Sequence, residues 1–181
     1  MRLLFEIDNH DYPPDGTRYV RPSVRGIILR GGTVALVRSL EYSFYKFPGG
    51  GIEAGEDHRE TLIREVAEES GLVVIPDSIR PYGRVRRVDW TAGRADIFEQ
   101  DNYYYLCETE PVPGAQRLTA SEQRLRLALE WADPRTAIAA NRAAARDPAF
   151  LRTRAGHPNM LEREARVLEA LIEEGLIIPN S

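Results

Sequence analysis

The chain has 181 residues, of which 43% are hydrophobic, so it is long enough to bury the core of one ordinary domain. Its formal net charge of −4 argues against a general affinity for nucleic acid or for anionic membranes. We therefore interpret residues 1–181 as a single domain that binds neither.

The N-terminus and the cysteine content indicate a cytoplasmic protein. Glu6 and Asp8 interrupt the first apolar run before a signal-peptide core could form. No apolar run approaches the ~18 residues that a membrane span needs. Cys107 is the only cysteine, so no internal disulfide can form, which suits a reducing compartment.

The first half of the chain reads as strands and turns. Residues 3–7 predict a short strand, and residues 11–21, which are rich in proline and glycine, predict a loop. Two strand-like runs over 24–29 and 33–38 flank Gly31-Gly32, which predicts a hairpin. A Phe-Pro-Gly-Gly-Gly segment then breaks regular structure ahead of a helix.

The second half predicts another hairpin and terminal helices. Residues 79–90 and 97–108 are strand-like, with a turn over 91–94 between them. The later predictions are a loop over 111–121, a strand over 126–132, a helix begun by Asp133 and Pro134, and a final helix over about 159–174 that Gly175 ends. Strands on both sides of a central helix, followed by helices within 133–175, predict an α/β fold with helices packed on a mixed sheet.

The central helix carries three carboxylates on one side. Within residues 50–72, Asp57 can cap the helix with Glu60 in a capping box, and Gly71 can end it. The helical period places its apolar residues on one side and its acids on the other. The apolar residues are Leu62, Ile63, Val66 and Ala67, and the acids are Glu65, Glu68 and Glu69.

These three acids are unfavourable for the helix alone. Carboxylates at positions i, i+3 and i+4 repel by a few tenths of a kcal/mol per pair, and they lie near the helix C-terminus, where the dipole disfavours anions. A hard divalent cation with oxygen ligands would reverse that penalty. The alternative interpretation is a solvated acidic helix face.

The residues around the acids favour the cation. The segment Gly50–Leu72 resembles the signature of the Nudix hydrolase family: G, five residues, E, seven residues, R-E-aliphatic-any-E-E-any-G-aliphatic. The specified positions are filled without a gap by Gly50, Glu56, Arg64, Glu65, Val66, Glu68, Glu69, Gly71 and Leu72. The resemblance implies a Nudix α/β/α sandwich and hydrolysis of a diphosphate linkage in a nucleotide-like substrate.

The resemblance also implies roles for single residues. Glu65, Glu68 and Glu69 would hold catalytic Mg²⁺, or Mn²⁺ in its place, with the backbone carbonyl of Gly49 completing the coordination. Glu56 would support the metal site and contribute to metal binding through water, and Arg64 would orient Glu65 by an ion pair.

A carboxylate must also take a proton from the attacking water. In the family this base is either a signature glutamate, here Glu65 or Glu68, or an acid on a later loop. Glu122 is our candidate for the second kind, with an ordinary surface acid as the alternative.

Four basic residues are candidates for binding phosphate. Arg38 ends a predicted strand and Lys46 precedes the Pro-Gly-Gly turn. Arg84 and Arg86 share one face of a later strand, because side chains alternate along it.

The substrate prediction rests on what is missing. The chain lacks the family's markers for ADP-ribose, diadenosine polyphosphates and NADH, so a normal or oxidised nucleoside triphosphate is predicted by default. Two alternatives stay open: a nucleotide-sensing module without catalysis, and an isoprenoid diphosphate isomerase that uses Cys107. The sequence leaves the oligomeric state open and is compatible with a homodimer.

Overall fold

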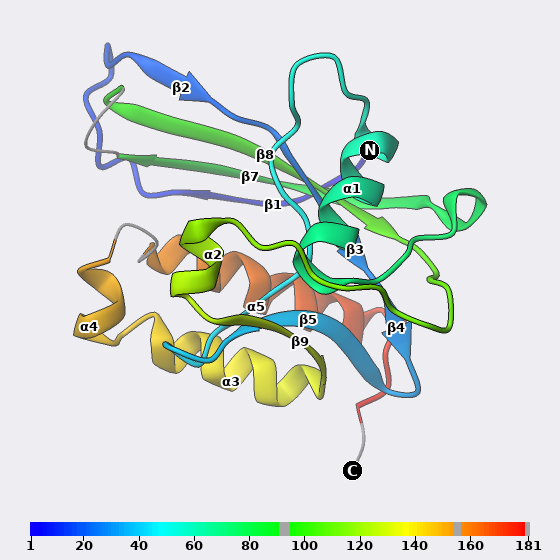
Figure 1. The fold of residues 1–181 in the computed structure, drawn as a ribbon. Coiled ribbons are helices and arrows are strands. Elements are labelled where there is room, and N and C mark those ends of the chain that lie inside the picture. The colour runs from blue at the N-terminus through cyan, green and yellow to red at the C-terminus, as the bar shows by residue number, and fades with distance from the viewer. Residues whose placement is uncertain (91–94, 154–156, 180–181) are drawn as a thin grey trace.

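A computed structural model describes residues 1–90, 95–153 and 157–179 of the chain. Within these ranges the strands form two sheets, and helices pack on them from two sides (Figure 1). This arrangement confirms the predicted α/β fold with a mixed sheet between helices.

The larger sheet has five strands and mixes parallel and antiparallel pairs. Its order is β1 (Leu3–Asp8), β7 (Arg80–Trp90), β8 (Ile97–Leu106) and β2 (Arg18–Val20), with β3 (Ser23–Ile27) also paired to β8. Strands β7 and β8 pair antiparallel, as predicted for this hairpin, whereas β1, β2 and β3 run parallel to their partners. The turn predicted over 91–94 lies outside the described residues.

The smaller sheet is antiparallel and has four strands. It consists of β4 (Leu29–Arg30), β5 (Thr33–Ser39), β6 (Tyr45–Lys46) and β9 (Leu127–Ala132). The predicted hairpin joins β4 to β5 through Gly31 and Gly32, which have positive φ values of 52° and 80°. The chain after β6 then bonds to β3 of the other sheet, where Val24 N–H donates to Gly50 at 2.9 Å.

Helices cover both faces of strand β5. The helices in the described residues are α1 (His58–Ser70), α2 (Ala120–Arg124), α3 (Pro134–Ala144), α4 (Pro148–Leu151) and α5 (Pro158–Glu173), and a 3-10 turn, η1, lies at Pro76–Ser78. Two of them, α1 and α5, pack against β5. Ala35 of β5 packs with Leu62 and Val66 of α1, while Leu36 packs with Val167 and Leu168 of α5. The alternation of side chains along β5 therefore places α1 on one side of the sheet and α5 on the other.

The ends of α1 form as the sequence predicts. The Asp57 side chain accepts from the Glu60 backbone N–H, and the Glu60 side chain accepts in return from Asp57 N–H. Gly71 ends the helix with a φ of 75°, which a residue with a Cβ rarely adopts. These caps fix the axial position of the acidic residues between them.

The last elements also follow the sequence closely. Asp133 caps α3 with Pro134 in its first turn, and α5 ends just before Gly175, whose φ is 69°. The predicted loop over 111–121 holds no regular element until α2 begins at Ala120. Among the described residues, no helix is long and apolar enough to cross a membrane.

Candidate functional site

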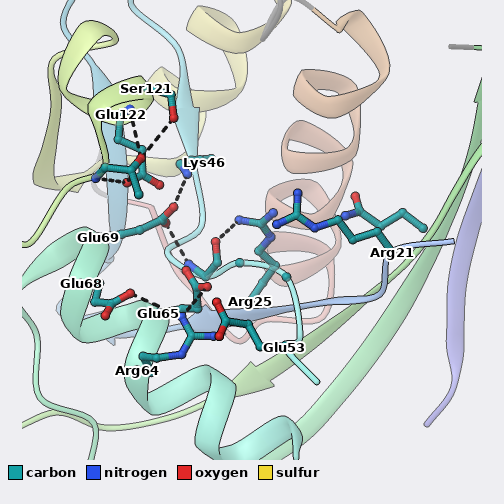
Figure 2. A pocket seen from close by; sticks show the side chains of 15 residues that line it. Arg21, Arg25, Lys46, Glu53, Arg64, Glu65, Glu68, Glu69, Ser121 and Glu122 are labelled. Carbon is teal, nitrogen blue, oxygen red and sulfur yellow. Dashed lines mark hydrogen bonds and ion pairs between the residues drawn. The ribbon is translucent and has the colours of Figure 1, made fainter. Parts of the chain in front are cut away.

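The acidic side of α1 borders a cavity of about 420 Å³. The other walls come from β3, the 46–51 segment and the loop that leads into α2, so segments far apart in the chain meet here (Figure 2). The acidic side chains that line it are Glu53, Glu65, Glu68, Glu69 and Glu122, and the basic ones are Arg21, Arg25, Lys46 and Arg64. A cavity with this lining suits a polar ligand that carries several charges.

Arg64 organises the acids on one side of the cavity. Its Nε and Nη2 donate to the two oxygens of Glu56 at 2.6 and 2.7 Å, and its Nη1 donates to Glu65 at 2.8 Å. Glu68 lies 3.4 Å from the same Nη1. Hydrogen bonds from Arg64, with others from Thr61 and the Glu53 backbone, lower the pKa of Glu56 to about 2. The Arg64–Glu65 pair that the sequence implies is therefore present in the structure.

Glu69 is the most buried of the three helix acids, with 3% of its surface exposed. Its carboxylate contacts the Lys46 ammonium and accepts the Gly49 backbone N–H at 3.0 Å. Burial raises the pKa of Glu69, and the nearby charges of Lys46 and Arg25 oppose that rise. Helix periodicity predicts a carboxylate on the acidic face, but the depth of Glu69 depends on chain segments that are remote from it.

Two glycines allow the 46–51 segment to lie close to its neighbours. Gly49 has a φ of 143°, and a Cβ there would come within 2.2 Å of the Val24 carbonyl oxygen. A Cβ on Gly50 would come within 2.3 Å of the Glu65 carboxylate. The backbone can therefore approach β3 at Gly49 and α1 at Gly50 only because side chains are missing at these positions. The Gly49 carbonyl, a predicted metal ligand, accepts a hydrogen bond from Arg25.

Glu122 lines the cavity from the first turn of α2. Its carboxylate caps α2 by accepting the backbone N–H and the hydroxyl of Thr119, both at 2.8 Å. Burial raises the pKa of Glu122, but the Thr119 donors and the Lys46 charge outweigh it, so the pKa lies below its usual range. The loop before α2 is tied to α1, since Arg117 N–H donates to the Glu68 carbonyl at 2.8 Å. Sequence and structure thus agree in bringing Glu122 near the helix acids.

Three predicted phosphate-binding residues lie elsewhere. Arg38 pairs with Glu130 at 3.0 Å, Arg84 with Asp101 at 2.8 Å, and Arg86 with Glu99 at 2.7 Å, and none of the three arginines lines the cavity. Arg84 and Arg86 do share a strand face, but both form ion pairs with acids of the neighbouring strand β8. Alternation along a strand predicts which residues share a face and not what lies opposite it. Lys46, the fourth candidate, does line the cavity.

The sequence interpretation missed Arg21 and Arg25. Both line the cavity, together with Gln100 and Ser121. One available signal was overlooked: Arg25 interrupts an apolar run, Val24 to Leu29, and arginine is rarely buried in a strand without a partner or a purpose. No comparable signal marks Arg21, which lies in a loop rich in proline and polar residues.

The donor set around the cavity fits a hard divalent cation. Glu65, Glu68 and the buried Glu69 face it from one helix, and the Gly50 backbone lies against Glu65, where any Cβ would obstruct. In the described part of the chain, no three His, Cys, Asp or Glu side chains are close enough together to hold an ion as they stand. Lys46 contacts the Glu69 carboxylate and Arg64 contacts the Glu65 carboxylate. A bound ion would therefore replace these contacts or share the carboxylates with them.

Comparison with known proteins places this geometry in a family. The NUDIX domain model matches residues 20–153, which is most of the chain and includes the acidic helix. A search of curated proteins found no match.

A search of solved structures found similar chains, one of which superposes well enough to share the fold. A NUDIX hydrolase from Nitrosomonas europaea superposes with a TM-score of 0.54 at 16% identity, over 89% of this chain and 93% of that one. A MutT NUDIX hydrolase from Burkholderia pseudomallei has a TM-score of 0.46 at 19% identity, over 55% and 75% of the two chains. An ADP-ribose pyrophosphatase from Streptococcus suis has a TM-score of 0.41 at 17% identity, over 54% and 66%.

Proposed function

This chain belongs to the Nudix family and is a pyrophosphohydrolase, and from that premise we propose that it cleaves a nucleoside triphosphate in the presence of Mg²⁺. The observation that carries the proposal is the cavity in which the helix acids lie opposite basic side chains. One wall supplies oxygen ligands for a cation, and the other supplies donors for phosphate oxygens.

Glu65, Glu68 and Glu69, with the Gly49 carbonyl, would hold the ion. When bound, Mg²⁺ or Mn²⁺ neutralises charge on the diphosphate and acidifies a water molecule. Arg64 keeps the Glu65 carboxylate oriented towards the cavity, and Glu56 in turn holds Arg64 by two hydrogen bonds. Glu56 therefore supports the site through Arg64.

Glu122 is our candidate for accepting the proton of the attacking water. It lines the same cavity as the helix acids, which supports this role, and its lowered pKa means that the carboxylate is ionised at neutral pH. Glu68 is the alternative on the helix, because it is the most exposed of the three helix acids. Lys46, beside Glu69, would donate to a phosphate oxygen once the ion takes over that carboxylate.

Two other activities fit the site less well. An isoprenoid isomerase would need its cysteine at the cavity, but Cys107 borders a different hollow, and burial raises the pKa of its thiol to about 12. A sensing module without catalysis has no use for an intact set of helix acids.

The test is a panel of nucleoside triphosphates, diphosphates and dinucleotides, each incubated with Mg²⁺, with Mn²⁺ and with excess chelator. Phosphorus NMR identifies the products, and ¹⁸O-labelled water shows which phosphorus is attacked. We expect turnover of a triphosphate only with metal. Full turnover in chelator, binding without turnover, or isomerisation without phosphate release would each contradict the proposal.

A further inference from the structure

We propose that Arg21 and Arg25 form an anion subsite that binds a third phosphate group of the substrate and so selects triphosphates over diphosphates. The subsite lies in the same cavity as the acids of α1, at the wall built by β3 and the chain just before it. This inference rests on the proposed function, because it names the part of the substrate that the second wall of the cavity recognises.

Arg25 is a buried cation with unused hydrogen-bonding capacity. It lies in the middle of β3, with 9% of its surface exposed. One guanidinium nitrogen donates to the carbonyl oxygens of Gly49 and Phe47, while its buried Nε has no hydrogen-bond partner. Both contacts are to neutral carbonyls, and the nearby Glu69 carboxylate, whose pKa the Arg25 charge helps to lower, hydrogen-bonds to Lys46 and Gly49 and not to Arg25. Arg25 therefore has no hydrogen-bonded anion to balance its buried charge. An anionic oxygen in the cavity would satisfy that charge.

Arg21 reaches the same cavity from outside the strand. Its side chain lies over the backbone of Gly51, where a Cβ would come within 2.7 Å of the Arg21 Nε. Among the described residues, no hydrogen bond or ion pair to its guanidinium is found. Figure 2 shows Arg21 and Arg25 on the side of the cavity away from Glu68 and Glu122.

The other two cations of the cavity are already engaged. Lys46 contacts Glu69, and Arg64 holds Glu56 and Glu65. Arg21 and Arg25 are thus the two basic side chains of the cavity for which the described residues provide no ion pair. A diphosphate at the acidic wall would leave them without an anion, whereas one more phosphate would extend the ligand towards them. Guanidinium groups suit this role because they can donate two parallel hydrogen bonds to one phosphate.

The test measures binding and not turnover. Nucleoside tri- and diphosphate analogues with methylene groups in place of the bridging oxygens cannot be hydrolysed at those positions. Calorimetry with Mg²⁺ gives the dissociation constant of each for the wild type, for Arg21→Ala and for Arg21→Lys. The control is Arg135→Ala, an exposed arginine on α3 away from the cavity. Adenosine analogues are used unless the substrate panel selects another base.

We expect the wild type and the control to bind the triphosphate at least about tenfold more tightly than the diphosphate, which corresponds to about 1.4 kcal/mol. Arg21→Ala should reduce that preference to about twofold or less, and Arg21→Lys should fall between. Arg25→Lys, which keeps the buried charge, should also weaken triphosphate binding, and circular dichroism checks its fold. A preference unchanged in Arg21→Ala, no preference in the wild type, or no binding of either analogue overturns the subsite.

Failure of the subsite differs from failure of the proposed function. Turnover of a triphosphate together with an unchanged preference in Arg21→Ala rejects the subsite and keeps the hydrolase. A lost preference without turnover of any nucleotide keeps the subsite and rejects the proposed reaction.

Discussion

Arg64 holds the carboxylate of Glu56 at both oxygens, with N–O distances of 2.6 and 2.7 Å. Glu56 lies in the turn before α1, and Arg64 lies in the middle of the helix. The same guanidinium donates to Glu65, so the turn and the acidic face are connected through one side chain. This connection explains why a cation belongs among carboxylates that would otherwise repel one another.

The first prediction concerns Arg64→Ala. Removing the guanidinium leaves Glu56, Glu65 and Glu68 without their shared cation, so the metal-free protein should lose stability. Thermal melting in chelator should show a clear decrease, at about 2–4 °C for each kcal/mol lost in a chain of this size. Activity should also fall, because Glu65 loses its orientation.

The control for this prediction is Arg59→Ala, which removes an exposed arginine from the same helix. If both variants melt alike in chelator, the Arg64 network contributes nothing to the fold. If Arg64→Ala retains wild-type kcat, the orientation of Glu65 does not depend on it.

The second prediction separates Glu68 from Glu69. Both Glu68→Gln and Glu69→Gln should lower kcat by at least ~10², because metal-based charge stabilisation is worth several kcal/mol. Their metal-free stabilities should differ. Glu68→Gln removes a partly exposed charge whose repulsion with Glu65 offsets its long contact with Arg64, so stability should stay unchanged or rise by a few tenths of a kcal/mol. Glu69→Gln removes the buried partner of Lys46 and should cost about 1.5–3 kcal/mol.

Urea unfolding in chelator, and again with Mg²⁺, measures both effects. Mg²⁺ should stabilise the wild type according to RT ln(1 + [L]/Kd) and should stabilise each variant less. Equal destabilisation by Glu68→Gln and Glu69→Gln would mean that the contact between Glu69 and Lys46 does not add to the free energy of unfolding. Near wild-type kcat at saturating Mg²⁺ would refute the ligand roles.

The third prediction concerns Glu122→Gln. Glutamine can keep the capping box with Thr119, so α2 should remain folded. The amide cannot take a proton from water, so kcat should fall by ~10² or more if Glu122 is the base. Glu108→Gln serves as the control, since Glu108 is an exposed acid outside the cavity. Small and equal effects of the two changes would mean that Glu122 is an ordinary surface acid without a catalytic role.

The acidic wall could be predicted from sequence because its determinants are local. Asp57 and Gly71 set the ends of α1, and a period of 3.6 residues sets which acids share a face. The basic wall could not be predicted in the same way. Arg25 reaches the cavity because β3 pairs in parallel with β8, a strand some eighty residues away, and because the 46–51 segment crosses beside it. Pairing of that kind leaves no periodic trace in the sequence.

A second feature that sequence reasoning missed is the polar contact between the terminal helices and the 46–51 segment. Glu164 of α5 is buried and accepts the Phe47 backbone N–H at 2.9 Å. Within an amphipathic helix, Glu164 reads as one more surface acid. Its burial follows from Arg163 beside it and from Asn102 on β8, to which Arg163 donates. Such a network becomes visible only once the helix is placed on the sheet.

The last prediction tests how the same helices hold the segment that precedes the Gly49 turn. Asn141 of α3 is fully buried, and its amide accepts Tyr45 N–H at 2.7 Å and donates to the Tyr45 carbonyl at 2.9 Å. It therefore replaces a neighbouring strand along the free edge of β6, next to Lys46. In Asn141→Leu the branched shape of the side chain is kept but both backbone groups lose their partner, and each buried unsatisfied group costs about 1–3 kcal/mol. Urea unfolding should show a loss of about 2–4 kcal/mol, whereas Asn9→Ala, at an exposed asparagine, should change little. Turnover should fall in the surviving folded fraction, because Lys46 and the Gly49 carbonyl follow directly from the loosened strand. If Asn141→Leu is as stable as the wild type, then packing alone positions β6, and the hydrogen bonds from α3 play no part in holding the site.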